Sequence, residues 1–210
     1  MSVPRRPATE LLVLHGVRLL GHAPDAAVAA RFGLDLDSTT ELLEDAEALG
    51  QVSRSTFGAS TGWSLTDRGR ARNEALLAEE LERLGVRDRV VAVHEEFVPL
   101  NARLLDACTR WQLRPLPGDP LAANDHTDHA WDDRVLEDLV SVGRALEPLG
   151  VRLSGVLPRC SGYPTRYTAA LAKAVQGERS WVDGIGIDSC HRVWMQLHED
   201  LLATLGIPRG

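Results

Sequence analysis

Histidine and tryptophan residues are concentrated in the second half of this 210-residue chain. Four of the five tryptophans and five of the seven histidines follow residue 86. Indole rings combined with imidazoles are typical of a pocket that is apolar but carries a few directed polar groups. The alternative is that these rings are core side chains whose polar atoms are satisfied internally. We therefore expect the second half to hold either a small-molecule site or an aromatic core.

A polar loop and a later helix carry most of these side chains. The segment NDHTDH, residues 124–129, precedes a predicted helix that Asn124 or Asp128 can cap, and the start of such a helix favours an anion. His191 and His198 are seven residues apart, so they share one face of the last predicted helix. We predict that this loop and this face converge and bind a small organic anion, more strongly at mildly acid pH, where histidine is protonated. The candidate ligand-binding residues are Trp111, Asn124, His126, Asp128, His129, Trp131, His191, Trp194 and His198.

Metal binding and catalysis have weaker support in the sequence. His191 and His198 are separated by about 10.5 Å along a helix, which is too far for both to bind one ion through bonds of about 2 Å. A metal site built from the loop and one of these histidines stays open as an alternative. The sequence contains no GxSxG, P-loop, GxGxxG or HExxH motif. We expect no catalytic activity, no cofactor and no metal ion.

Hydrophobic periodicity predicts the elements that must position these side chains. The first half reads as three helices, a β-hairpin and a long helix; these elements cover residues 8–22, 25–33, 35–50, 51–65 and 66–85. The second half reads as four helices, over residues 88–111, 131–150, 163–177 and 188–206, with Pro99 expected to kink or break the first of them. The expected fold class is mainly α. We place a winged helix-turn-helix domain at residues 1–86 and an all-helical domain at residues 87–210.

The sequence LTDRGR, residues 65–70, resembles the turn that follows the second wing strand in MarR-like winged-helix transcriptional regulators. In such a turn Thr66 can cap the exit helix and Gly69 allows close packing against the sheet. The resemblance covers residues 8–84 and implies a DNA-binding homodimer whose second motif helix enters the major groove. The candidate DNA-binding residues are Ser38, Thr39, Thr40, Arg54, Arg68 and Arg70.

The charge of the expected recognition helix argues against simple phosphate binding. The chain has a net charge of −7, and residues 32–53 contain six carboxylates and no lysine or arginine. Affinity for DNA would therefore depend on arginines of the wing and exit helix, and on Arg5 and Arg6 of the N-terminal arm. The alternative is a winged helix that does not bind DNA and instead serves as a docking or accessory module for a partner protein.

The second half also resembles a known type of segment. Residues 90–205 are similar to a helical segment of actinobacterial proteins that follows a winged helix or is appended to phosphoenolpyruvate-utilising enzymes related to pyruvate phosphate dikinase. This resemblance implies a ligand-sensing regulator or an accessory module of such an enzyme. We expect a homodimer that contacts itself through the exit helix and the helix beginning near Asp88.

The charged residues and the cysteines indicate the cellular compartment. No stretch free of Asp, Glu, Lys and Arg exceeds 12 residues, which excludes a predicted membrane span. Glu10 interrupts the apolar run near the N-terminus, so we do not expect a signal peptide. The three cysteines are widely spaced and do not suggest a disulfide framework. We expect a cytoplasmic protein.

Overall fold

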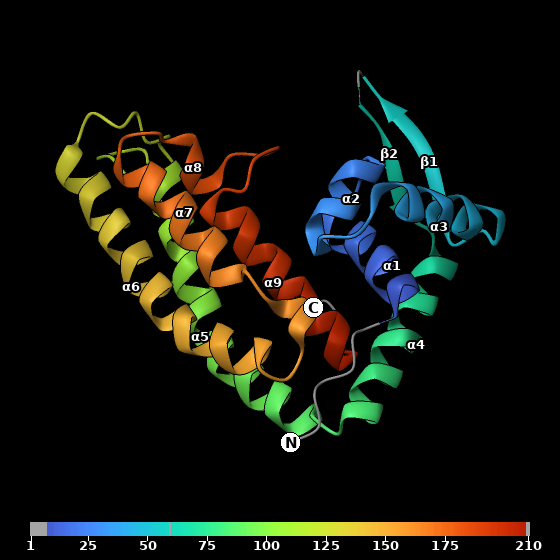
Figure 1. Cartoon of the computed structure of the whole chain (residues 1–210). Helices are drawn as coiled ribbons and strands as arrows, with labels where there is room; N and C mark the ends of the chain where they lie inside the picture. The colour runs from blue at the N-terminus through green and yellow to red at the C-terminus, as the bar shows by residue number, and fades with distance from the viewer. Residues whose placement is uncertain (1–7, 59, 209–210) are drawn as a thin grey trace. The chain divides into compact units, whose positions relative to one another are not determined.

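The computed structural model describes residues 8–58 and 60–208. It is mainly helical and has a two-stranded antiparallel sheet, as expected for the fold class (Figure 1). The chain divides into two compact units. The described residues up to 87 and from 199 onward form the first unit, and residues 88–198 form the second. Residues 199–210 were expected in the second domain, whereas residues 199–208 belong to the first unit.

The first unit contains the predicted series of elements. Its helices are α1 (Thr9–Leu20), α2 (Asp25–Phe32), α3 (Leu36–Ala48) and α4 (Asp67–Leu84), and its strands are β1 (Val52–Phe57) and β2 (Ser60–Leu65). Val52 pairs with Leu65 and Phe57 with Ser60. The paired strands therefore include Ser60 and Thr61, which were expected to belong to a loop at residues 58–61. Hydroxyl pairing between Thr56 and Thr61, at 2.9 Å, accompanies this extension of the ladder.

Apolar faces of these helices meet in one core that also includes the end of α9 (Cys190–Leu205). Leu14 of α1, Leu43 of α3 and Leu77 of α4 are fully buried there, and Trp63 of β2 is 1% exposed. Ala203 of α9 belongs to the same core. Residues 199–205 of α9 thus complete the first unit, while residues 190–198 belong to the second.

The turn before α4 has the local structure expected from its sequence. The Thr66 hydroxyl accepts a hydrogen bond from the Gly69 amide at 3.1 Å and donates to the Gly50 carbonyl at 2.7 Å. A Cβ atom at Gly69 would lie only 1.8 Å from the Gln51 carbonyl oxygen. The predicted cap at Thr66 and the predicted close packing at Gly69 are both confirmed.

The second unit is built from α5 (Arg87–Gln112), α6 (His129–Ser154), a 3₁₀ turn (Pro158–Cys160), α7 (Tyr163–Val175), α8 (Ser180–Asp183) and the first part of α9. Helices α5 and α6 are antiparallel neighbours (Figure 1). Arg110 bonds Asp138 at 2.6 Å near one end, and Arg152 bonds Glu96 at 2.8 Å towards the other.

Two internal prolines do not end their helices. Pro99 was expected either to kink or to break this helix. Helix α5 continues through Pro99, so it is not broken there. Phe97 and Leu104 on either side of Pro99 are both buried, and this packing holds the two halves in one helix. Helix α6 likewise passes Pro148 and ends at Ser154, four residues beyond its predicted end. Across the described residues, none of the helices combines the length and the apolar character needed to cross a membrane.

Candidate functional site

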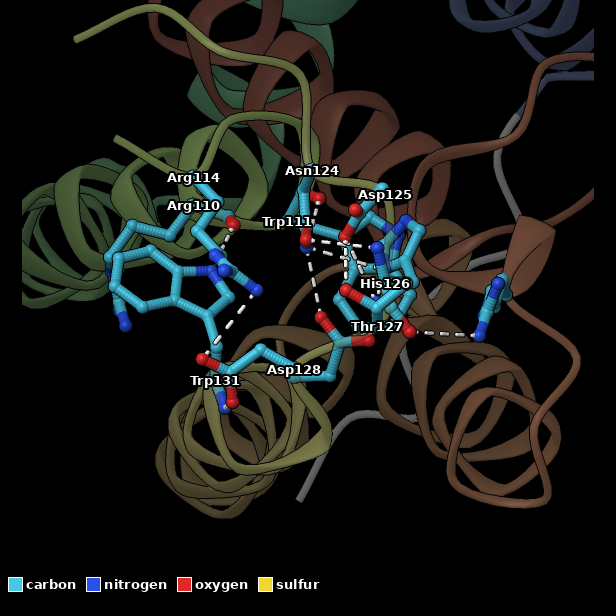
Figure 2. Close-up of polar contacts among 11 residues, drawn as sticks. Arg110, Trp111, Arg114, Asn124, Asp125, His126, Thr127, Asp128 and Trp131 are labelled. Carbon is cyan, nitrogen blue, oxygen red and sulfur yellow. Dashed lines mark hydrogen bonds and ion pairs between the residues drawn. The ribbon is translucent and has the colours of Figure 1, made fainter. Parts of the chain in front are cut away.

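A polar network joins the loop of residues 113–128 to the helices on either side of it (Figure 2). The buried Asn124 amide nitrogen donates to the Trp111 carbonyl of α5 at 3.0 Å and to Asp132 of α6 at 2.9 Å. The Asn124 oxygen accepts from the His126 amide at 3.1 Å. One side chain therefore ties the loop to both helices. Of the nine residues predicted to bind a ligand, Trp111, Asn124, His126 and Asp128 lie in this region.

His126 is held in a fixed orientation within this network. Its Nδ1 lies 3.0 Å from Asp132 Oδ2, and its ring centroid lies 4.6 Å from that of Trp111. Its φ angle of 60° is in the left-handed region, which costs a non-glycine residue about 1–2 kcal/mol. When Nδ1–H donates to a carboxylate, Nε2 is left as a hydrogen-bond acceptor or base. The network thus presents one oriented imidazole whose side chain is 18% exposed.

The start of α6 is occupied by the chain's own carboxylate. Asp128 accepts a hydrogen bond from the Trp131 amide at 3.1 Å, which confirms it as the cap of α6. Arg114 Nη1 lies 3.5 Å from the other oxygen of Asp128, and the Trp131 indole donates to the Arg110 carbonyl at 2.8 Å (Figure 2). The helix end that we expected to bind an external anion therefore already holds Asp128.

Asp125, in the same loop, is stabilised as a carboxylate by Thr127. Asp125 accepts hydrogen bonds from the Thr127 amide at 3.0 Å and from the Thr127 hydroxyl at 2.8 Å. These bonds lower the pKa of Asp125 below its ordinary value, with the backbone bond contributing most.

The aromatic face of α9 lies apart from this loop. Trp194 is fully buried, donates to Asn101 of α5 at 2.9 Å and stacks on Phe97 with a centroid distance of 4.7 Å. His198 packs on the same Phe97 ring at 5.5 Å. Because Asn101 and Trp111 are ten residues apart on α5, their levels differ by about 15 Å along that helix.

The predicted single cavity is therefore wrong. Trp194 is a core side chain, His191 is half-buried one turn before it on α9, and His129 is an exposed residue at the start of α6. The face of α9 that carries Trp194 and His198 packs against the middle of α5 and does not reach the loop. In the described part of the chain, no group of three or more histidine, cysteine, aspartate and glutamate side chains is placed to hold a metal ion.

Cys108, Cys160 and Cys190 are all buried. Burial raises the pKa of the Cys108 and Cys190 thiols to about 12, so at pH 8 only about one such thiol in ten thousand is ionised. We expect a thiol reagent at pH 8 to modify fewer than one cysteine per native chain within an hour. The same assay in concentrated guanidinium should titrate all three. Rapid modification of the native chain would contradict this burial.

The three hydroxyl residues predicted to bind DNA, Ser38, Thr39 and Thr40, form hydrogen bonds within α3 and to its cap. The Ser38 amide and hydroxyl donate to Asp35, the cap of α3, at 3.0 and 2.9 Å. Thr39 is fully buried and donates to the Asp35 carbonyl at 2.6 Å, so its assignment as a DNA contact is wrong. Thr40 is half-buried and donates to the Leu36 carbonyl at 3.0 Å.

The exposed surface of α3 is acidic. No lysine or arginine lies between Leu36 and Ala48, and the carboxylates on its exposed side are Asp37, Glu41, Glu44, Asp45 and Glu47. Leu36 and Leu49, at the two ends of this helix, are 47% and 52% exposed. This surface would repel phosphate and suits a partner that is basic.

Exposed arginines lie on the sheet and on the first turn of α4. Arg54 of β1 places its guanidinium 5.3 Å from the centroid of Trp63, and Arg68 and Arg70 are exposed. Arg72 is bound to Glu10 through bonds of 2.8 and 2.9 Å. Arg5 and Arg6 of the expected N-terminal arm lie outside the described residues.

A buried polar cluster in the first unit was missed in the sequence. His15 Nε2 lies 3.0 Å from Asp200 of α9, and His15 Nδ1 lies 3.4 Å from the Asn73 oxygen of α4. All three side chains are at most 1% exposed. The available signal was that each of these polar residues interrupts an otherwise apolar helix face.

Comparison with known proteins adds no assignment: no family model, no curated protein and no solved structure matches the chain.

Proposed function

We propose that the protein is a transcriptional regulator that binds DNA as a homodimer. In this proposal the first unit is a winged helix-turn-helix and the loop network of the second unit is the effector site. The observation that carries the proposal is the series of three helices, hairpin and exit helix, joined by the Thr66–Gly69 turn and bearing three exposed arginines. Within the described residues Arg54, Arg68 and Arg70 form no ion pair, so they are available to phosphates.

The proposal assigns these arginines to the phosphate backbone. A protein that neutralises phosphates releases counterions, and the logarithm of its affinity falls with the logarithm of salt concentration by about 0.9 for each phosphate. Three such contacts give a measurable slope even though the chain as a whole is acidic. The acidic side of α3 then either faces away from the duplex, or its repulsion of the phosphates is outweighed by these arginine contacts.

The test is a titration of the upstream region of the protein's own gene, at low and at high salt. We expect Arg54→Ala to weaken binding to every sequence tested and to reduce the salt slope by about 1. Arg83→Ala is the matched control, because Arg83 is exposed at the far end of α4. Two chains per bound duplex are expected for the homodimer.

Absence of affinity for any DNA at low salt would contradict the regulator proposal. If the wild-type chain binds DNA and Arg54→Ala leaves the salt slope unchanged, the wing does not contact the phosphates.

The acidic exposed surface of α3 favours a second candidate function. In this alternative the first unit is a docking module, and α3 binds a basic surface of a partner such as a phosphoenolpyruvate-utilising enzyme. The variant Glu41→Gln/Glu44→Gln/Glu47→Gln separates the two candidates. If α3 faces DNA, removing three negative charges strengthens DNA binding. If α3 faces a basic partner, the same change weakens the complex with that partner.

A further inference from the structure

The first unit contains a cavity of about 520 Å³ that shares Arg70 with the proposed DNA-binding surface. Its walls come from Arg18 of α1, from the start of α4, from the end of α9 and from residues 206–208. This volume is within the range of about 300–1,000 Å³ that is typical of small-molecule sites.

Two charged side chains of α4 are open to a ligand in this cavity. Arg70 is exposed, and among the described residues it forms neither a hydrogen bond nor an ion pair through its side chain. Glu74 is 46% exposed and bonds Arg18 Nη1 through Oε1 at 2.9 Å, which leaves Oε2 without a partner in the described part of the chain. The wall therefore offers one cationic and one anionic group.

These two groups would be expected to pair with each other, since they are four residues apart on one helix. They do not, because Arg18 holds Glu74. Arg18 is itself fixed by a 2.7 Å bond from its Nε to Glu199, a side chain only 5% exposed. The buried Arg18–Glu199 pair thus keeps Glu74 away from Arg70, and about 6 Å separates the Cβ atoms of an i, i+4 pair.

The rest of the lining is apolar. Leu202 and Ala203 of α9 are buried, and Ile207 and Pro208 follow the end of that helix. A ligand that fits this cavity needs apolar groups for this surface, together with one charge of each sign.

We propose that the cavity binds a zwitterion of the dipeptide class, whose carboxylate pairs with Arg70 and whose ammonium group pairs with Glu74. An extended dipeptide separates its terminal charges by about 7 Å, at about 3.5 Å per residue. A single amino acid carries both charged groups on one carbon, so it is too short to pair with Arg70 and Glu74 as well as a dipeptide does. Blocking either terminus leaves one lining charge without its partner, which weakens binding.

The experiment is calorimetric titration of the full chain with three probes that share the same side chains. Leucyl-leucine carries both charges, N-acetyl-leucyl-leucine only the negative charge, and leucyl-leucinamide only the positive charge. We expect leucyl-leucine to bind and each blocked probe to bind about tenfold more weakly. Equal binding of a blocked probe, or no binding of leucyl-leucine at millimolar concentration, would overturn the proposal.

Two variants assign the charges. Arg70→Gln should weaken leucyl-leucine about tenfold and leave the amide unaffected, whereas Glu74→Gln should weaken leucyl-leucine and leave the acetylated probe unaffected. Arg83→Gln is the matched control, because Arg83 is an exposed arginine of the same helix that does not line the cavity. Loss of binding in the control, or wild-type binding in both lining variants, contradicts the assignment. No DNA is used, so failure here leaves the regulator proposal intact.

Discussion

Replacing Asp200 by alanine is expected to lower the free energy of unfolding by about 3 kcal/mol. The Asp200 carboxylate is 1% exposed, lies 3.0 Å from His15 Nε2 and accepts a hydrogen bond from the Thr204 hydroxyl at 3.3 Å. His15 is fully buried in the first unit. Removal of the carboxylate takes an acceptor away from a buried imidazole and leaves a space in the core, and both effects destabilise the folded state.

Urea unfolding followed by far-ultraviolet circular dichroism measures this change. Asp200→Asn keeps the size of the side chain and one acceptor oxygen, so it should lower the free energy of unfolding by less than Asp200→Ala does. Glu82→Ala removes an exposed carboxylate from α4 and should change the unfolding free energy by less than about 0.5 kcal/mol. If Asp200→Ala is as mild as Glu82→Ala, the buried cluster does not stabilise the first unit.

The second large effect is expected at Asp132. Asp132→Ala should lower the free energy of unfolding by about 2–4 kcal/mol and detach the loop of residues 113–128 from α6. Asp132 is 7% exposed and its two oxygens bond different partners, Asn124 at 2.9 Å and His126 at 3.0 Å. Without it, the buried Asn124 amide loses its acceptor on α6, and the left-handed backbone at His126 loses the contact that stabilises it.

Limited proteolysis, read by mass spectrometry, tests the release of this loop. Cleavage within residues 113–128 should become several-fold faster in Asp132→Ala, while Asp133→Ala, an exposed neighbour, should resemble the wild type. Asp132→Asn should be intermediate, because a neutral amide offers only one acceptor oxygen. Loop cleavage at the wild-type rate in Asp132→Ala would show that the network does not hold the loop.

Much of the fold was predictable because its signals are local. The apolar faces of α1, α3 and α4 recur at helical spacing, and the cap at Thr66 and the cap at Asp128 are each made within three residues. The helix ends that were mispredicted depend on distant packing. Gly150 resembles a helix stop, yet it lies inside α6. Pro164 of α7 packs so closely there that a Cβ atom added at Gly150 would lie 2.2 Å from Pro164 Cγ.

The candidate site was predictable to the same extent. Asn124, His126 and Asp128 come together because they are close in sequence, and they gather around the nearby start of α6. The location of Trp194 depends instead on Asn101, which is 93 residues away, and no periodicity encodes that pairing. The sequence also shows an apolar face along the whole length of α9, so it does not reveal that the last part of this helix belongs to a different core.

That division of α9 bears on how the chain folds during synthesis. His15 and Asp200 are 185 residues apart in the sequence, so the core of the first unit cannot be completed until residue 200 has been synthesised. At about 5–20 residues per second, translation from residue 87 to residue 199 takes about 6–22 s. Throughout that interval the apolar sides of α1 and α4 lack the segment that covers them, which makes the nascent N-terminal half a client for chaperones that bind exposed apolar chain.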